Sequence, residues 1–213
     1  MISLRQFIGL FSISCLSLSA AANNPLVEMK TDTGNFVIEV YEDKAPITAA
    51  NFLGYVDSGF YEGTIFHRIV PSFVVQGGGY TFDLKEKPTR DPIKLETDAQ
   101  LANDYKTVAM ARQDYAHSAT SQFFVNLKNN EALNPSGRNR GYAVFGKVVQ
   151  GIETIEKMVD EPRGMYRIFP EAPNYPIRIL SVKRIKSLQE ASPSSSTQPK
   201  FQSKFKDALV KPQ

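Results

Sequence analysis

Hydrophobic and polar positions alternate along several short stretches in the middle of the chain, which is the pattern of half-buried β-strands. In residues 35–40, for example, Phe36, Ile38 and Val40 fall on one face. Further stretches rich in Val, Ile and Phe predict strands at residues 65–69, 73–76, 107–111, 122–126, 143–149 and 176–185. Many short strands with few helices favour a closed or nearly closed antiparallel barrel.

Two segments have the spacing of amphipathic helices instead. The first follows Pro46 and ends at Ser58-Gly59, and its apolar side chains recur every three or four residues. That apolar stripe consists of Ala49, Phe52, Leu53 and Val56. The second covers residues 152–159 and is closed by Pro162. Two such helices are suited to covering the open ends of a barrel.

The two ends of the chain differ in composition from its middle. Residues 1–22 contain one arginine, an apolar run and the alanines 20–22, which predicts a secretory signal peptide cleaved after Ala22. The alternatives are a buried N-terminal helix and a lipid-modified N-terminus at Cys15. Residues 187–213 are rich in Ser, Pro, Gln and Lys, which predicts a disordered basic tail. The remaining residues, 23–186, are enough for one domain.

Composition and charge narrow the classes of function. The chain has 213 residues, one cysteine and two histidines, which leaves no disulfide framework and disfavours a Cys or multi-histidine metal site. Residues 23–186 hold 20 Lys and Arg against 20 Asp and Glu. Because phosphate binding needs a clustered basic face, nucleic acid is not expected as the main partner. Beyond the N-terminal segment no apolar run is long enough for a membrane span.

Four segments carry the residues with chemical potential. They are FHRIVPSFVVQGG at 66–78, MAR at 110–112, SATSQFF at 118–124 and GYAVFGKVV at 141–149. In the first, Arg68 stands close to Phe73 and Gln76. This combination places a charged hydrogen-bond donor beside an apolar surface.

In this order and spacing the four segments resemble the cyclophilins, the prolyl-isomerase family with an eight-stranded barrel. The resemblance covers nearly all of residues 26–186. It implies a mainly β fold, a closed eight-stranded antiparallel barrel capped by two α-helices. The MAR and GYAVFGKV variants look most like the exported bacterial branch of the family. This implies a periplasmic protein, which agrees with the independently predicted signal peptide.

The resemblance also implies roles for individual residues. Arg68 matches the catalytic arginine of the family. The positions that match substrate-binding residues are His67, Phe73, Val74, Gln76, Ala111, Arg112, Phe124, Leu133 and Tyr142. Where many members carry an aromatic residue at the pocket rim, this chain has Ala132. We therefore expect cyclosporin-type ligands to bind weakly.

The implied reaction is rotation about the X–Pro amide, whose barrier of about 18–20 kcal/mol comes from amide resonance. The twisted amide has a more basic prolyl nitrogen, so an arginine N–H that donates to it binds the transition state better than the planar ground state. The reaction needs no metal or cofactor. The predicted substrates are proline-containing polypeptides, and the predicted role is to assist the folding of exported proteins.

Two alternatives remain open at this point. The chain is either this enzyme, expected as a monomer, or a non-catalytic module that binds proline-containing peptides. The presence of Arg68 favours the enzyme. A barrel that carries a small ligand would have a hollow interior, whereas the aliphatic and aromatic inward positions here favour a filled one.

Overall fold

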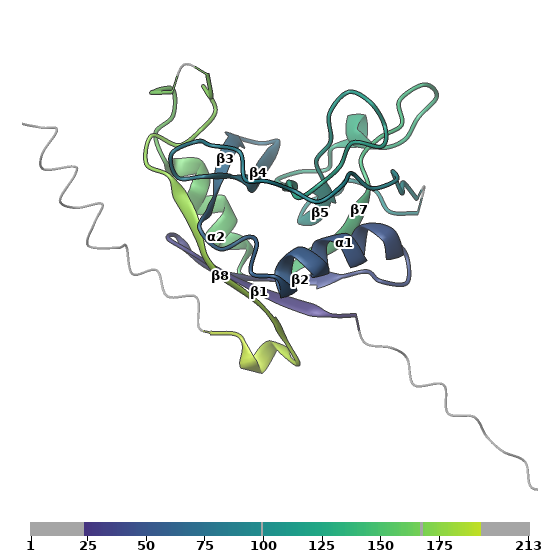
Figure 1. The fold of residues 1–213 in the computed structure, drawn as a ribbon, viewed down its shortest axis with the longest axis horizontal. Helices are drawn as coiled ribbons and strands as arrows, with labels where there is room; N and C mark the ends of the chain where they lie inside the picture. The colour runs from purple at the N-terminus through teal and green to yellow at the C-terminus, as the bar shows by residue number, and fades with distance from the viewer. Residues whose placement is uncertain (1–23, 99, 167, 193–213) are drawn as a thin grey trace, which may run out of the picture.

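The computed structural model describes residues 24–98, 100–166 and 168–192. Within these ranges, eight strands close into one barrel in the order β1-β2-β7-β5-β6-β4-β3-β8, and each neighbouring pair is antiparallel. The strands are β1 (Leu26–Thr31), β2 (Gly34–Val40), β3 (Thr64–Val70), β4 (Val74–Thr81), β5 (Thr107–Met110), β6 (Phe123–Asn126), β7 (Val144–Gln150) and β8 (Ile177–Ile185). In Figure 1, β1 and β8 lie side by side although they come from opposite ends of the chain.

The predicted barrel and seven predicted strands are confirmed, and β1 is an eighth strand that the pattern did not predict. Both helices are present: α1 (Pro46–Asp57) and α2 (Ile152–Lys157), the latter continued by the 3-10 turn η2 (Met158–Asp160). Two further 3-10 turns are η1 (Glu131–Leu133) and η3 (Leu188–Glu190). No helix among the described residues is both long and apolar enough to cross a membrane.

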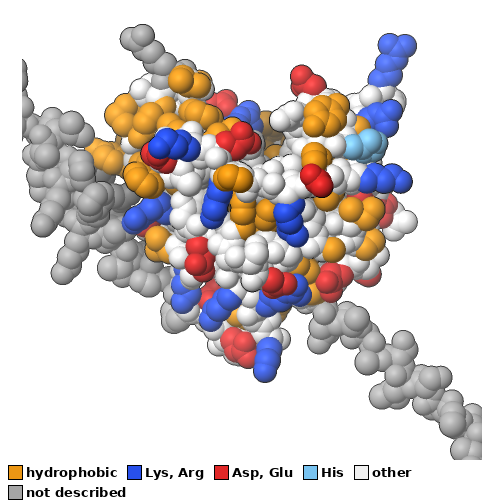
Figure 2. Space-filling view, viewed as in Figure 1, with side chains coloured by type: hydrophobic (Ala, Val, Ile, Leu, Met, Phe, Trp, Pro, Cys, Tyr) orange, Lys and Arg blue, Asp and Glu red, His pale blue; other side chains and the backbone are white. Residues whose placement is uncertain are grey.

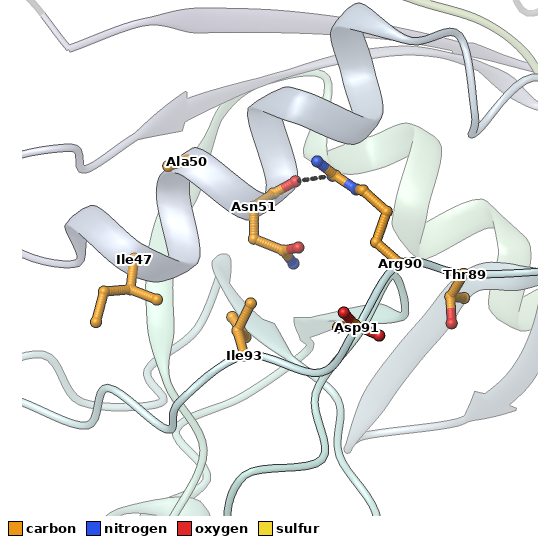
Figure 3. Close-up of a pocket in the computed structure, with 7 residues that line it drawn as sticks. All are labelled: Ile47, Ala50, Asn51, Thr89, Arg90, Asp91 and Ile93. Carbon is orange, nitrogen blue, oxygen red and sulfur yellow. Dashed lines mark hydrogen bonds between the residues drawn. The ribbon is translucent and has the colours of Figure 1, made fainter.

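The segment before β5 holds α1 in place. The Glu96 carboxylate accepts hydrogen bonds from the backbone N–H groups of Ile47 (3.2 Å) and Thr48 (2.9 Å) at the start of the helix, where free N–H groups favour a negative charge. Arg90 stacks its guanidinium on the Tyr55 ring at 3.9 Å. It also donates to the α1 backbone at the Asn51 carbonyl (2.9 Å; Figure 3).

The barrel interior is filled by side chains. Phe52 of α1 lies with its ring centroid 4.8 Å from Phe145, 5.5 Å from Tyr61 and 5.8 Å from Phe123. These four rings are all fully buried. Gly78 has a positive φ of +84°, and a Cβ there would lie 2.9 Å from the Tyr61 and Phe123 rings. The interior is therefore closely packed, and the hollow-barrel alternative is wrong.

A second, smaller apolar cluster lies on the outside of the barrel wall. Its buried members are Val74, Ala109, Ala111, Phe124 and Val144, with Phe73, Leu101, Leu133 and Tyr142 packed against them. Because side chains alternate along a strand, Phe123 of β6 faces the interior cluster while Phe124 faces this outer cluster.

The ends of the chain are described only in part. The first residues of the predicted tail, 187–192, contain η3, and the Ser192 N–H donates to the buried carboxylate of Glu28 on β1 (2.5 Å). The tail beyond residue 192 and the predicted signal peptide at 1–22 lie outside the described residues. The domain boundaries therefore remain predictions.

Candidate active site

The outer cluster forms the floor of a pocket with a volume of about 240 Å³. Its lining consists of Arg68, Phe73, Val74, Gln76, Ala111, Arg112, Phe124, Leu133 and Tyr142. Nine of the ten site residues predicted from the sequence are thus brought together from five separate stretches of the chain. His67 is the one that does not line the pocket.

Strand register explains how the central residues meet. Arg68 on β3 pairs with Gln76 on β4, and Gln76 pairs in turn with Phe124 on β6. The three residues therefore form one row across three neighbouring strands. The turn between β3 and β4 is tight, with Ser72 at a positive φ of 56°, and it brings Phe73 beside Arg68. The Arg68 Cζ atom lies 5.8 Å from the centre of the Phe73 ring.

The Arg68 guanidinium has a carboxylate neighbour that the sequence did not predict. Its Nε atom lies 2.5 Å from Oε2 of Glu171, and both side chains are partly exposed, at 36% and 44%. The Glu171 backbone is fixed on β3, because its carbonyl accepts a hydrogen bond from the Ile69 N–H (2.9 Å). Glu171 stands in an irregular loop before β8, where no periodicity or motif shows which residue it will meet.

The opposite rim of the pocket is aromatic and cationic. The Phe124 and Tyr142 rings meet nearly at right angles, with centroids 5.5 Å apart. Arg112 lies over the Tyr142 ring at 4.7 Å and donates from Nε to the Gly141 carbonyl (3.0 Å). On the wall between the rims, Gln76 donates to the side-chain oxygen of Gln122 (2.9 Å). These contacts orient the polar groups around the apolar floor.

Buried asparagines support the floor from beneath. Asn130 donates to the Phe73 carbonyl (3.0 Å) and to the Asn126 side-chain oxygen (2.7 Å). Asn126 donates to the side-chain oxygen of Asn103 (3.2 Å). The side-chain nitrogen of Asn103 in turn donates to the Leu133 carbonyl (3.1 Å). A fully connected buried network restricts the groups that it joins, so Phe73 and Leu133 are held in a fixed relation.

His67 lies behind the pocket instead of in its lining. The pairing of β3 with β4 is irregular between Phe66 and Arg68, and the His67 ring packs against Tyr80 (4.6 Å) and Phe169 (6.3 Å). It is 5% exposed, and its Nδ1 atom is buried without a hydrogen-bond partner among the described residues. Burial lowers the pKa of His67 to about 4, and the nearby charge of Arg68 also lowers this pKa. His67 is thus buried beside the pocket and packed between aromatic rings.

The pocket combines an arginine donor, an apolar floor and oriented amides. The described residues contain no group of three or more His, Cys, Asp or Glu side chains that could hold a metal ion. The arrangement suits binding of a small apolar ring, with a hydrogen bond offered at its edge.

Comparison with known proteins places the chain among proteins of one family. Residues 26–184 match the family model described as cyclophilin type peptidyl-prolyl cis-trans isomerase/CLD. A peptidyl-prolyl cis-trans isomerase of Acinetobacter baylyi is 49% identical over 171 residues, which cover 80% of this chain and 90% of that protein. Peptidyl-prolyl cis-trans isomerase A of Dickeya dadantii is 45% identical over 184 residues, covering 86% and 97%. Peptidyl-prolyl cis-trans isomerase B of Escherichia coli is 42% identical over 160 residues, covering 74% and 98%.

A solved structure shows the same fold at lower sequence similarity. The cyclophilin type peptidyl-prolyl cis-trans isomerase of Cryptosporidium parvum superposes with a TM-score of 0.65 at 24% identity. The match covers 77% of this chain and 99% of that one. The fold is therefore shared with a solved structure of low sequence identity.

Proposed function

Because the chain belongs to the cyclophilin-type peptidyl-prolyl cis-trans isomerases, we propose that the outer pocket is its active site and that exported polypeptides are its substrates. One observation carries this assignment: Arg68, Phe73, Phe124 and Leu133 converge on one pocket of about 240 Å³. That pocket offers a permanent cation beside an apolar surface of proline size.

The reaction follows from the chemistry of the X–Pro amide. Rotation breaks the amide resonance, and the lone pair returns to the prolyl nitrogen, which becomes a hydrogen-bond acceptor. The Arg68 guanidinium stays protonated and offers N–H groups in a rigid fork. Donation to this nitrogen stabilises the twisted state and not the planar one, so it lowers the barrier in both directions.

The apolar residues make that donation effective. Phe73, Phe124 and Leu133 enclose the proline ring and exclude water from one side of the rotating bond. In such an environment an oriented donor stabilises a developing acceptor more than it does in water. No covalent intermediate is required, because only a torsion changes.

The cellular setting is also a proposal. The signal-like segment 1–22 and the similarity to the exported bacterial branch support secretion to the periplasm. Fractionation of cells that express the full chain tests it: we expect the mature protein in the periplasmic fraction and retention in the cytoplasm when residues 1–22 are deleted. A Cys15→Ala variant distinguishes a cleaved signal from a lipid anchor. Unchanged release of the soluble mature protein is expected if cleavage follows Ala22, because Cys15 is then removed with the signal peptide.

Activity is tested by protease-coupled isomerisation of an Ala-Pro peptide. We choose this sequence because the similar protein of Cryptosporidium parvum was crystallised in the presence of the dipeptide Ala-Pro. We expect Arg68→Ala to lower kcat/KM by about 10²–10³-fold, the usual loss when one oriented donor is removed. Arg178→Ala, an exposed arginine of β8 outside the pocket lining, is the control and should retain activity. A wild-type protein that binds the peptide without accelerating isomerisation would support the binding-module alternative.

A further inference from the structure

A second hollow, of about 810 Å³, is lined by the loop that follows η1 and by two other segments. We call it the basic hollow, after Lys94, Arg138 and Arg140 in its lining. His117 also lines it, and none of its lining residues carries a carboxylate. Figure 2 shows Lys and Arg side chains gathered around a histidine at the edge of this face. The local charge is therefore positive, although residues 23–186 are neutral as a whole.

The protein does not neutralise this charge itself. Across the described ranges, the cations that form ion pairs are Arg68, Lys85, Arg178, Lys183 and Arg184. None of them belongs to the basic hollow. Its three cations are thus available to an anionic ligand from outside.

Hydrogen bonds hold the hollow open before any ligand arrives. The Asn139 side chain donates to the Ala132 carbonyl (2.9 Å) and accepts from the Gly141 N–H (3.0 Å). On the other wall, the Leu95 N–H donates to Nδ1 of His117 (3.0 Å), which leaves Nε2 as the proton-bearing nitrogen of the neutral ring. A preformed shape reduces the entropy lost when a ligand binds.

The loop at residues 133–142 connects the basic hollow to the candidate active site. Its two feet, Leu133 and Tyr142, are joined by a backbone hydrogen bond (3.0 Å) and both line the pocket. Its tip carries Arg138 and Arg140. A polypeptide whose proline occupies the pocket and whose chain continues over this loop therefore passes the cations within a few residues.

We propose that the basic hollow is a subsite for carboxylate side chains of the substrate polypeptide, so that acidic residues flanking the proline strengthen binding. This inference rests on the proposed function of the neighbouring pocket. It names a substrate class: proline-containing segments with Asp or Glu near the proline on one side.

Matched peptides test it. An Ala-Ala-Pro-Phe core is extended by Glu-Glu or by Gln-Gln, on the amino side in one pair and on the carboxyl side in the other. Dissociation constants from fluorescence anisotropy and KM from the isomerisation assay are compared at low salt. We expect one Glu-Glu peptide to bind about three- to tenfold more tightly than its Gln-Gln partner, from two exposed ion pairs, and salt to abolish the difference.

Variants locate the effect. Arg138→Gln/Arg140→Gln should remove the preference for Glu-Glu and leave the Gln-Gln constants unchanged. Lys30→Gln/Lys186→Gln removes one charge from β1 and one from the residue that follows β8, across the barrel, and should keep the preference. Equal binding of the Glu and Gln peptides on both sides, or an equal loss in the control, would overturn the subsite. Failure to isomerise any peptide would instead overturn the proposed function, because anisotropy still reports on the subsite.

A different observation carries a second inference, which also rests on the proposed function. The loop that presents Glu171 to Arg68 is firmly docked: Ala172 is 1% exposed, and the Phe169 ring packs on Tyr80 at 5.1 Å. The Glu171 carboxylate contacts the Nε atom of the Arg68 guanidinium at 2.5 Å. The two terminal nitrogens of Arg68 are left to donate hydrogen bonds to the substrate. We infer that Glu171 is a positioning residue, which restricts the rotation of Arg68 before the proline arrives.

The expected signature is a loss in kcat. Glu171→Ala should lower kcat about tenfold with little change in KM, whereas Glu171→Gln should recover most of it, because its amide oxygen can take the place of the carboxylate oxygen beside Nε. In an Arg68→Ala background the Glu171→Ala change should have no further effect. Full activity of Glu171→Ala, or an equal loss in both backgrounds, would contradict the role. Thermal unfolding of each variant shows whether the loop change has altered the fold.

Discussion

Phe123 and Phe124 are neighbours on β6, chemically identical and both buried, yet they belong to different regions. Phe123 is 0% exposed and meets the rings of Phe52, Tyr61 and Phe66 inside the barrel. Phe124 is 4% exposed and packs outward against Tyr142 at the pocket. The first ring is enclosed by other rings, while the second forms part of a surface left open for a ligand.

This difference shows how the barrel separates stability from catalysis. The alternation of side chains along a strand sends one residue to the interior and the next to the outer wall. The interior cluster joins most strands with α1, whereas the outer cluster joins the wall of β4, β5, β6 and β7 with the loops around it. Changes in the two regions should therefore have different signatures.

Phe123→Ala tests the interior side and should have the largest effect. Removal of a fully enclosed phenylalanine costs about 3–5 kcal/mol of unfolding free energy, because the surrounding rings collapse only in part. Urea denaturation measures the loss. The folded fraction at low temperature should retain kcat/KM close to that of the wild type. A loss below about 1 kcal/mol would show that the interior can repack.

Phe124→Ala tests the outer side. We expect kcat/KM to fall about 10–100-fold, because the proline ring loses one wall and water enters beside the rotating bond. The cost in unfolding free energy should be smaller than for Phe123→Ala, since the vacated space opens into the pocket and no enclosed cavity remains. The isomerisation assay and urea denaturation of the same preparation separate the two. The comparison fails if Phe124→Ala unfolds the protein as readily as Phe123→Ala.

His67 sharpens the comparison, because it adjoins Arg68 in the chain but belongs to the packed side. Its pKa of about 4 in the folded protein lies below the ordinary value of 6.5. The unfolded chain therefore binds more protons between pH 6.5 and 4, and stability is lost as the pH falls through this window. We expect a loss of about 2 kcal/mol from pH 7 to pH 5. Urea denaturation at both pH values measures it.

The control is the His67→Gln variant, which should lose much less stability over the same interval. Values of kcat/KM between pH 6 and 8 should show no titration from His67. An equal pH dependence in both proteins would assign the loss of stability to other groups.

The alternation of hydrophobic and polar residues predicted the strands that bury one face. It did not predict β1, where tertiary contacts allow a polar residue to be buried as well. In β1, Val27 and Met29 point inward as the pattern requires, but Glu28 between them is also buried, at 1% exposure. Its carboxylate has Lys183 at 3.5 Å, its register partner on the neighbouring strand β8, which comes from the other end of the chain. A buried acid breaks the expected alternation, and only closure of the barrel supplies the partner that permits it.

The same limit applies to the site. The pocket lining lies mostly in four contiguous motifs, so the resemblance predicted its residues and strand register then assembled them. The irregular pairing beside His67 is not visible in a sequence, and periodicity does not show that Glu171 reaches Arg68. Nor does it show that Arg138 and Arg140 line the same hollow as Lys94. Each of these contacts depends on how irregular loops dock, which local spacing does not determine.

The smallest effects should come from the wall that faces away from the pocket. In the barrel order, β1 lies opposite β6, and β8 lies opposite β5. A chain that ends after Ser192 should match the full chain in both kcat/KM and stability. One that ends after Ser187 also loses the hydrogen bond from the Ser192 N–H to Glu28, and we expect a cost of about 1.5 kcal/mol in unfolding free energy, the low end of the range for hydrogen bonds to a charged group. Both should keep kcat/KM within twofold, because neither removes a group that touches the rotating amide. A tenfold loss of kcat/KM in the shorter chain, with normal folding at the assay temperature, would show that the two walls are coupled.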